Sequence, residues 1–195
     1  FFDQFSVHAA VQPIDLIDIA GFKIPQGFYL HRGHTWAKIE EENTVRVGLD
    51  EFVLRTIGPF DRIEAPLIGK TVRQDAPDIA LRRGIKTAKA LSPISGVITA
   101  TNPKLLDHGR VNSREAYSDG WIMRIHADNL RQELKHLMIN AETAVFVEEE
   151  TQHLYRAIEE TAGPLAADGG QLVEDIYGQL PQIGWKKIVR LFLRS

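Results

Sequence analysis

Residues 35–52, TWAKIEEENTVRVGLDEF, carry the pattern that decides the fold. From Thr35 to Glu40 apolar and polar residues alternate, which is typical of a strand with one buried face. The next three residues, Glu41 to Asn43, are suited to a turn, and the alternation resumes from Thr44 to Leu49. This stretch therefore predicts a β-hairpin.

Short elements continue after this hairpin. Asp50 predicts the N-cap of a short helix over residues 51–57, which Gly58-Pro59 would end. Proline and glycine then separate further expected strands, which lie around Arg62–Ala65, Ile79–Leu81, Val97–Ala100 and Trp121–Ile125. Many short strands at even spacing indicate a barrel or a sandwich.

The two ends of the chain follow other patterns. Residues 1–26 are interpreted as an N-terminal arm, because Gly21 and Pro25 interrupt a short apolar stretch. After His126 the apolar spacing becomes helical, with helices expected over Asn129–Met138, Ala144–Thr161, Gln171–Tyr177 and Ile183–Leu193. The expected fold is mainly β with an α extension, divided into an arm (1–26), a β domain (27–127) and a C-terminal helical extension (128–195).

Composition narrows the possible functions. The 195 residues contain no cysteine, which excludes disulfides, iron–sulfur clusters and thiol chemistry within them. A net charge of −3 does not point to nucleic acid, and no apolar run approaches the length of a membrane helix. No signal-peptide pattern is found either. We therefore expect a cytoplasmic protein that binds neither nucleic acid nor membrane.

Several short motifs occur in one order along the β region. They are Tyr29–Trp36, Val45–Phe52, Pro66–Gly69, Ser92–Gly96 followed by Asn102, and the closing Asn112, Tyr117 and Gly120-Trp121. In this order, from Gly27 to Ile125, the chain resembles the H protein of the glycine cleavage system, with Thr35 where that family has glutamate. The resemblance implies a lipoyl-type barrel-sandwich hybrid without catalytic activity, which presents one lipoylated lysine at a hairpin tip.

The position of that lysine is where the chain departs from the family. Counting at the family's spacing from either Gly69 or Pro93 leads to Ile85, which cannot form an amide with lipoate. Lys86 follows directly, and Gly84 to Ala88 resembles the family's Ser-Val-Lys-Ala-Ala if one residue is deleted. A shift by one residue turns a strand side chain to the other face, although this rule is softer at a hairpin tip.

The residues around this position are basic. The family's glutamate, three residues before its lysine, corresponds to Arg82 or Arg83, and Lys89 adds a further charge. A partner that recognises an acidic hairpin would be repelled by these side chains. They form either a solvated surface or a surface for an anionic partner.

Two functions follow from this departure. We expect a non-catalytic scaffold or adaptor without any cofactor, which binds proteins such as the enzymes of a glycine-cleavage-like pathway. The alternative is a lipoyl carrier of glycine cleavage, or of a related system, modified on Lys86. No set of residues suggests an independent enzyme.

The last helix is basic on one side and apolar on the other. Such a helix packs on its own domain, docks in a partner groove or lies on a membrane, and we favour packing. Docking comes second, and its candidate residues are Trp185, Lys186, Lys187 and Arg190.

A metal site is not expected. His31 and His34 are three residues apart in an alternating region and should point to opposite faces, so they are poorly placed to bind one ion. We expect His34 to be a structural residue beside Trp36.

Overall fold

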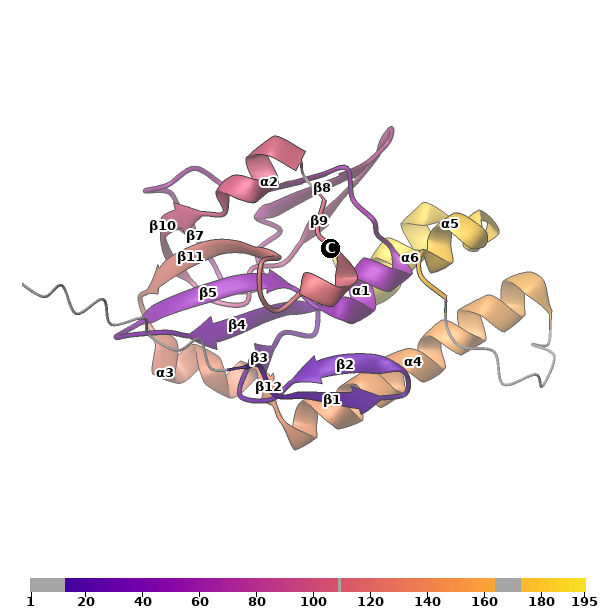
Figure 1. Ribbon diagram of the computed structural model, residues 1–195, viewed down its shortest axis with the longest axis horizontal. Coiled ribbons are helices and arrows are strands. Elements are labelled where there is room, and N and C mark those ends of the chain that lie inside the picture. The colour runs from indigo at the N-terminus through magenta and orange to yellow at the C-terminus, as the bar shows by residue number, and fades with distance from the viewer. Residues whose placement is uncertain (1–12, 109, 164–172) are drawn as a thin grey trace, which may run out of the picture.

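A computed structural model describes residues 13–108, 110–163 and 173–195, with the backbone alone for 106–108. Its main element is a seven-stranded antiparallel sheet in the order β12-β3-β4-β5-β11-β10-β7 (Figure 1). The strands are β3 (Tyr29–Leu30), β4 (Thr35–Ile39), β5 (Thr44–Leu49), β7 (Thr71–Val72), β10 (Gly96–Thr101), β11 (Trp121–Ala127) and β12 (Met138–Ile139). The hairpin expected from residues 35–52 is confirmed, because Thr35 pairs with Leu49 and Ile39 with Val45.

Two smaller sheets accompany it. A three-stranded antiparallel sheet in the order β6-β8-β9 consists of β6 (Arg62–Glu64), β8 (Ile79–Arg83) and β9 (Lys86–Ala90). A separate hairpin consists of β1 (Leu16–Ile19) and β2 (Phe22–Pro25), whose Phe22 and Ile24 are buried in the core. From Leu16 onward, the segment expected to be an arm is thus paired and partly buried.

The helices lie around these sheets. They are α1 (Glu51–Thr56), α2 (Pro103–His108), α3 (Leu130–Glu133), α4 (Ala141–Ala162), α5 (Ile176–Gln179) and α6 (Trp185–Phe192), with 3₁₀ turns at Ser113–Glu115, Leu134–His136 and Pro181–Ile183. Asp50 caps α1 as expected, since its Oδ1 accepts a hydrogen bond of 2.9 Å from the backbone N–H of Val53.

The C-terminal helices differ in part from the expected ones. The helix expected over Asn129–Met138 stops early, because Met138 and Ile139 pair with β3 as an edge strand. Residues 171 and 172 of the helix expected over Gln171–Tyr177 lie outside the described residues, and α5 begins at Ile176. A mainly β fold with helices after it is confirmed.

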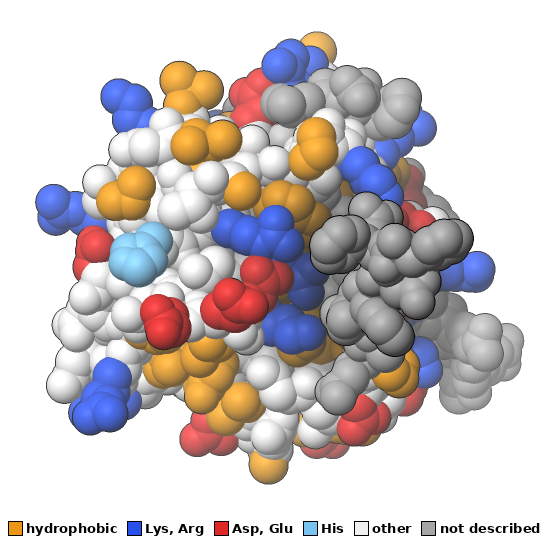
Figure 2. All heavy atoms as spheres, turned by 60° about the vertical axis from the view of Figure 1, so that its left-hand side comes forward, with side chains coloured by type: hydrophobic (Ala, Val, Ile, Leu, Met, Phe, Trp, Pro, Cys, Tyr) orange, Lys and Arg blue, Asp and Glu red, His pale blue; other side chains and the backbone are white. Residues whose placement is uncertain are grey.

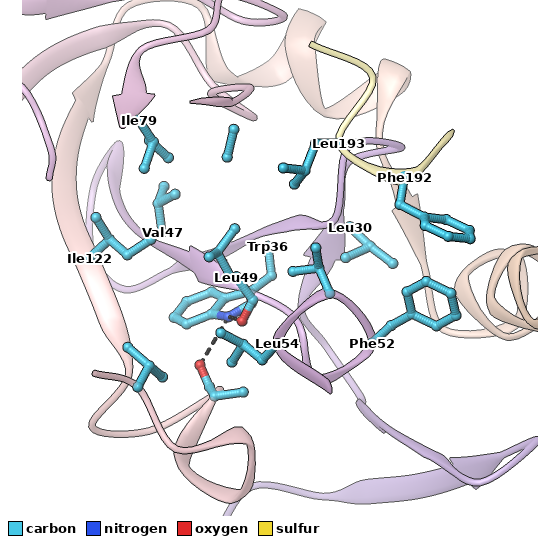
Figure 3. Packing of buried hydrophobic residues seen from close by; sticks show 14 of the residues in the cluster. Leu30, Trp36, Val47, Leu49, Phe52, Leu54, Ile79, Ile122, Phe192 and Leu193 are labelled. Carbon is cyan, nitrogen blue, oxygen red and sulfur yellow. Dashed lines mark hydrogen bonds between the residues drawn. The ribbon is translucent and has the colours of Figure 1, made fainter. Parts of the chain in front are cut away.

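Trp36 lies at the centre of the core. Its side chain is fully buried, and its Nε1 donates hydrogen bonds to the carbonyls of Leu49 and Ala116 at 3.0 and 3.1 Å (Figure 3). The indole lies against Gly48, where a Cβ atom would come within 2.4 Å of the ring. A glycine here gives the largest side chain of the core the room it needs.

The extension shares this core with the sheets. Phe192 of α6 packs edge to face on Phe52 of α1, with ring centroids 5.1 Å apart, and Ile188 and Leu193 are fully buried (Figure 3). In Figure 1, α4 passes along the β1–β2 hairpin, and contacts join these elements. Buried residues from both sides of residue 127 belong to one core. The division of the chain at that residue stays a prediction.

Candidate functional site

The hairpin of β8 and β9 is the candidate functional site. Its strands pair from Ile79 with Ala90 to Arg83 with Lys86, so Gly84 and Ile85 form a two-residue loop. Gly84 has a φ of 59°, as the first central position of such loops requires. The loop is held to the body, because the backbone N–H of Gly84 donates to Oδ2 of Asp61 at 2.6 Å.

Two residues at the tip were singled out by the sequence. Ile85 is 98% exposed at the turn, and Lys86 is the exposed first residue of β9. Within the described ranges, the Lys86 ammonium forms no hydrogen bond or ion pair. Lys86 is therefore an accessible primary amine next to the tip.

Strand alternation divides the expected basic cluster between two faces. Arg82 and Lys89 are exposed on the outer face, whereas Arg83 and Lys86 lie opposite each other on the other face. The sequence predicted the cluster but not this division.

Arg83 anchors the hairpin to the extension. Its guanidinium donates to the carbonyls of Ile57 and Gly58 at 2.8 and 2.7 Å and pairs with Asp175 at 2.8 Å. The same group lies over the ring of Tyr177, 5.2 Å from its centroid. Arg83, predicted as a partner-binding residue, is thus occupied within the chain. The sequence contained no signal for Asp175 and Tyr177, which follow it by about ninety residues.

The last helix lies beside the same hairpin. Nε1 of Trp185 donates to the carbonyl of Thr87 at 2.8 Å, and its ring packs on Tyr177 at 5.2 Å. Trp185 therefore covers part of the free edge of β9. Of the other candidate residues of α6, Lys187 pairs with Glu160 at 2.8 Å, whereas Lys186 and Arg190 are exposed. The structure thus brings Trp185 and the hairpin together, which the sequence treated as separate candidates.

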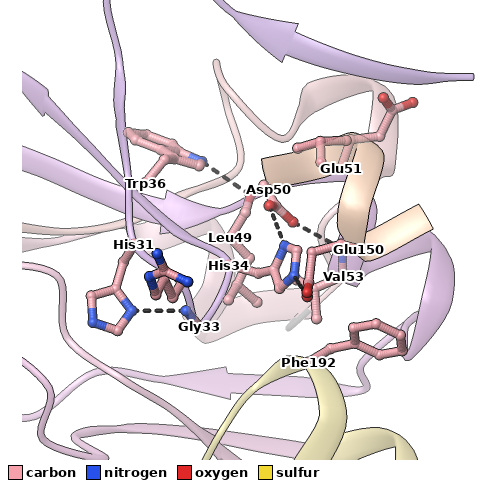
Figure 4. Close-up of polar contacts among 12 residues, drawn as sticks. His31, Gly33, His34, Trp36, Leu49, Asp50, Glu51, Val53, Glu150 and Phe192 are labelled. Atoms are coloured by element: carbon pink, nitrogen blue, oxygen red, sulfur yellow. Dashed lines mark hydrogen bonds and ion pairs between the residues drawn. The ribbon is translucent and has the colours of Figure 1, made fainter. Parts of the chain in front are cut away.

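A second polar cluster joins the sheets to the extension. His34 is fully buried; its Nδ1 lies 2.6 Å from Asp50, and its Nε2 lies 2.9 Å from Glu150 of α4 (Figure 4). Its ring, expected beside Trp36, stacks on Phe52 at 4.6 Å. Burial by itself lowers the pKa of His34, but the two carboxylates outweigh it and raise this pKa to about 9.

Glu150 is held as a carboxylate by two cations. Burial raises its pKa, but hydrogen bonds from His34 and Arg194 outweigh burial and lower the pKa to about 2. The Arg194 guanidinium lies 2.7 Å from Oε1 of Glu150. This cluster is an ionic connection between the sheets and the C-terminal helices, and no local sequence pattern pointed to it.

His31 lies in a separate pair. Its Nε2 is 2.6 Å from Asp75, while its Nδ1 accepts a hydrogen bond from the N–H of Gly33. Burial lowers the pKa of His31. In the part of the chain that the structure describes, no group of three or more His, Asp or Glu is arranged to hold a metal ion.

The surface is of mixed character. On the face shown in Figure 2, acidic and basic side chains are interspersed and the hydrophobic ones form small groups. Among the described helices, none is both long and apolar enough to cross a membrane. The cytoplasmic location stays a prediction.

Known proteins resemble this chain over most of the described fold. Residues 28–150 match the family described as Glycine cleavage H-protein. A probable glycine cleavage system H protein of Pyrococcus abyssi is 28% identical over 68% of this chain and 98% of its own length. The Glycine cleavage system H protein of Klebsiella pneumoniae is 33% identical over 56% of this chain and 84% of its own length.

A solved structure supports the fold. The crystal structure of a glycine cleavage system H protein from Mycobacterium marinum aligns with a TM-score of 0.50 and 21% identity. It covers 53% of this chain and 86% of that protein. The expected H-protein-like fold, a lipoyl-type barrel-sandwich hybrid, is confirmed.

The family match also corrects one expectation. We expected no cofactor, because the family's lysine position fell on Ile85, but glycine cleavage H proteins carry lipoate on a lysine. They have no catalytic activity of their own and work with the enzymes of glycine cleavage, in agreement with the expected lack of enzymatic activity and the expected protein partners. Because the matched residues make up more than half of its length, the chain belongs to the glycine cleavage H-protein family.

Proposed function

We propose that this protein is a lipoyl carrier of a glycine cleavage system, modified on Lys86. The observation that carries the proposal is the position of Lys86, an exposed amine beside a two-residue hairpin tip. Attachment of lipoate requires an amine that an enzyme can reach. Among the described residues, none forms a hydrogen bond or an ion pair with the Lys86 amine.

The one-residue departure from the family's spacing is compatible with this role. The Ile85 side chain is 98% exposed and makes no contribution to the core. The loop can therefore present Lys86 to an enzyme in place of residue 85 without a loss of core packing. The register places Lys86 opposite Arg83, at the last pair before the turn. A single deletion beside such a tip changes which residue is presented without disturbing the inward-facing pairs Ile79–Ala90 and Leu81–Ala88.

The residues around Lys86 fit attachment of a long arm. The Lys86 amine would form an amide with the carboxyl carbon of an activated lipoyl group, losing a proton while the activating group departs. When bound, lipoate supplies the dithiolane that carries the transferred group. The chain itself supplies position, since Arg83 and Trp185 hold the tip end of the hairpin against Asp175, at the start of α5, and against α6.

The partners would be the enzymes of glycine cleavage. A carrier must present the same arm to each enzyme in turn, which suits a single lysine on a projecting hairpin. Arg82 and Lys89, on the outer face of that hairpin, are the basic residues that such enzymes would meet.

Intact mass tests this function. We expect the protein, co-expressed with the lipoate–protein ligase of its own organism, to gain one lipoyl mass increment. Lys86→Ala should abolish the increment, and Lys70→Ala, which removes an exposed lysine outside the hairpin, should keep it. An unmodified parent protein, or an increment retained in Lys86→Ala, would overturn the proposal.

A further inference from the structure

The outer face of the three-stranded sheet gathers positive side chains from all three strands. Arg62 of β6 lies directly opposite Arg82 of β8, and Lys89 of β9 lies opposite Ala80 one step along. All three cations are exposed and line one hollow together with Glu64, and Val189 and Ser195 of the C-terminal extension form part of its wall. We refer to Arg62, Arg82 and Lys89 as the outer basic face.

The charges of this face are only partly balanced. Arg62 forms an ion pair with Glu64. Arg82 and Lys89 form no ion pair with any residue of the described ranges. Like charges directly opposite each other in a sheet are destabilising. The pairing of Arg62 with Arg82 therefore does not increase the stability of the fold. An anionic partner would supply the missing compensation.

The opposite face of the hairpin is already occupied. There Arg83 binds Asp175 and lies over Tyr177, and Trp185 binds the carbonyl of Thr87 at the edge of β9. These contacts leave exposed the end of that face beside the tip, where Lys86 lies one residue pair beyond Arg82 and Thr87. A protein that reaches Lys86 therefore comes within one residue pair of the outer basic face. The basic residues therefore lie where a partner of the tip would make contact.

We propose that the outer basic face docks an acidic protein surface on the enzymes that act on Lys86. This inference rests on the proposed carrier function. An acidic protein fits this face better than a single-stranded nucleic acid, because the outer positions of the three strands carry no aromatic side chain on which bases could stack, and Glu64 interrupts the cations.

Binding of an acidic peptide tests the surface. The probes are a fluorescein-labelled oligoglutamate peptide and a single-stranded oligonucleotide of equal charge, measured by fluorescence anisotropy at low salt with the full chain. We expect Arg82→Glu and Lys89→Glu each to weaken peptide binding by roughly five- to tenfold, because a rim charge mainly affects association. Arg131→Glu, which changes an exposed residue of α3, makes the same change in net charge and should have little effect.

Two results would overturn the docking surface. One is an equal loss of peptide binding in Arg131→Glu, which would mean attraction by net charge alone. The other is oligonucleotide binding that is tighter than peptide binding and sensitive to the same variants. Unchanged thermal unfolding of the three variants shows that they remain folded.

Lipoylation kinetics separate this inference from the proposed function. We expect Arg82→Glu to raise KM for lipoylation of Lys86 by the organism's own ligase, with kcat retained, and Arg82→Lys to restore KM. Modification at an unchanged KM would overturn the docking surface and leave the carrier function intact. Failure to modify the parent protein, with peptide binding as expected, would overturn the carrier function and with it the proposed identity of the partners.

Discussion

Oε2 of Glu150, in α4, lies 2.9 Å from Nε2 of His34, in the turn before β4, and both side chains are buried. Asp50 contacts the other nitrogen of the same imidazole, and Arg194 contacts the other oxygen of the same carboxylate. Four charged groups thus alternate in sign from the start of α1 to the end of the C-terminal helix. This cluster makes the extension part of the fold and leads to the first two predictions.

Removing the Glu150 carboxylate should be strongly destabilising. Glu150→Ala leaves a buried imidazolium with one carboxylate instead of two, and breaking a buried pair in this way costs about 3–5 kcal/mol. Urea unfolding monitored by circular dichroism measures the loss. The neighbouring Glu149 is exposed, so Glu149→Ala is the control and should cost little. Equal effects of the two substitutions would show that the pair contributes nothing.

Stability should fall as pH rises above neutrality. His34 has a pKa of about 9 in the folded protein against an ordinary 6.5, so its stabilisation is complete below pH 6.5 and lost as pH rises through 9. The slope approaches about 1.4 kcal/mol per pH unit, the value for one proton. Chemical unfolding between pH 6 and pH 9.5, spanning this window, measures the slope.

Other groups limit stability on the acid side. The lowered pKa of His31 means that its contribution is lost as pH falls below 6.5. The contribution of Glu150 is lost as pH falls from 4.5 through about 2. Maximum stability is therefore expected near pH 6.5. In His34→Asn the decline above this pH should flatten, whereas His136→Asn, which changes an exposed histidine, should keep it. An unchanged decline in His34→Asn would contradict the assignment.

Loss of the Trp185 hydrogen bond should loosen the β8–β9 hairpin. Trp185→Phe keeps an aromatic ring but removes the donor to the carbonyl of Thr87, which is worth about 1 kcal/mol. Amide hydrogen exchange of residues 79–90, measured by mass spectrometry, should then be roughly fivefold faster, in line with that loss. Leu191→Ala, a partly exposed position of the same helix, should leave this exchange unchanged. Equal rates in Trp185→Phe and the parent would show that Trp185 does not hold the hairpin.

The close contact between Trp36 and Gly48 can be tested by a double-mutant cycle. Gly48→Ala would place a Cβ 2.4 Å from the indole, and such overpacking costs about 1–3 kcal/mol. In a Trp36→Leu background the same substitution should cost much less, because the ring that it meets is gone. Unfolding free energies of the four proteins complete the cycle, and strictly additive effects would contradict the contact.

The sequence by itself determined the elements whose signals are local. The alternation from Thr35 to Leu49 and the cap at Asp50 each depend on neighbouring residues, and both were found where they were expected. The family too could be recognised from the sequence, because its short motifs occur in one fixed order. The basic composition of the β8–β9 hairpin was likewise visible in the sequence.

Only the tertiary structure decided which residues far apart in the sequence contact each other. Glu150 is 116 residues from His34, and Trp185 is 98 residues from Thr87, so no local period relates either pair. The faces of Arg82 and Arg83 depend on strand register, and the place of Lys86 beside the tip depends on a two-residue loop. Counting along a sequence cannot locate a single deletion, whereas the pairing of backbone hydrogen bonds shows which residue stands at the turn. For that reason the candidate hairpin could be named from the sequence, but the place of Lys86 as the first residue after the two-residue loop came only from the structure.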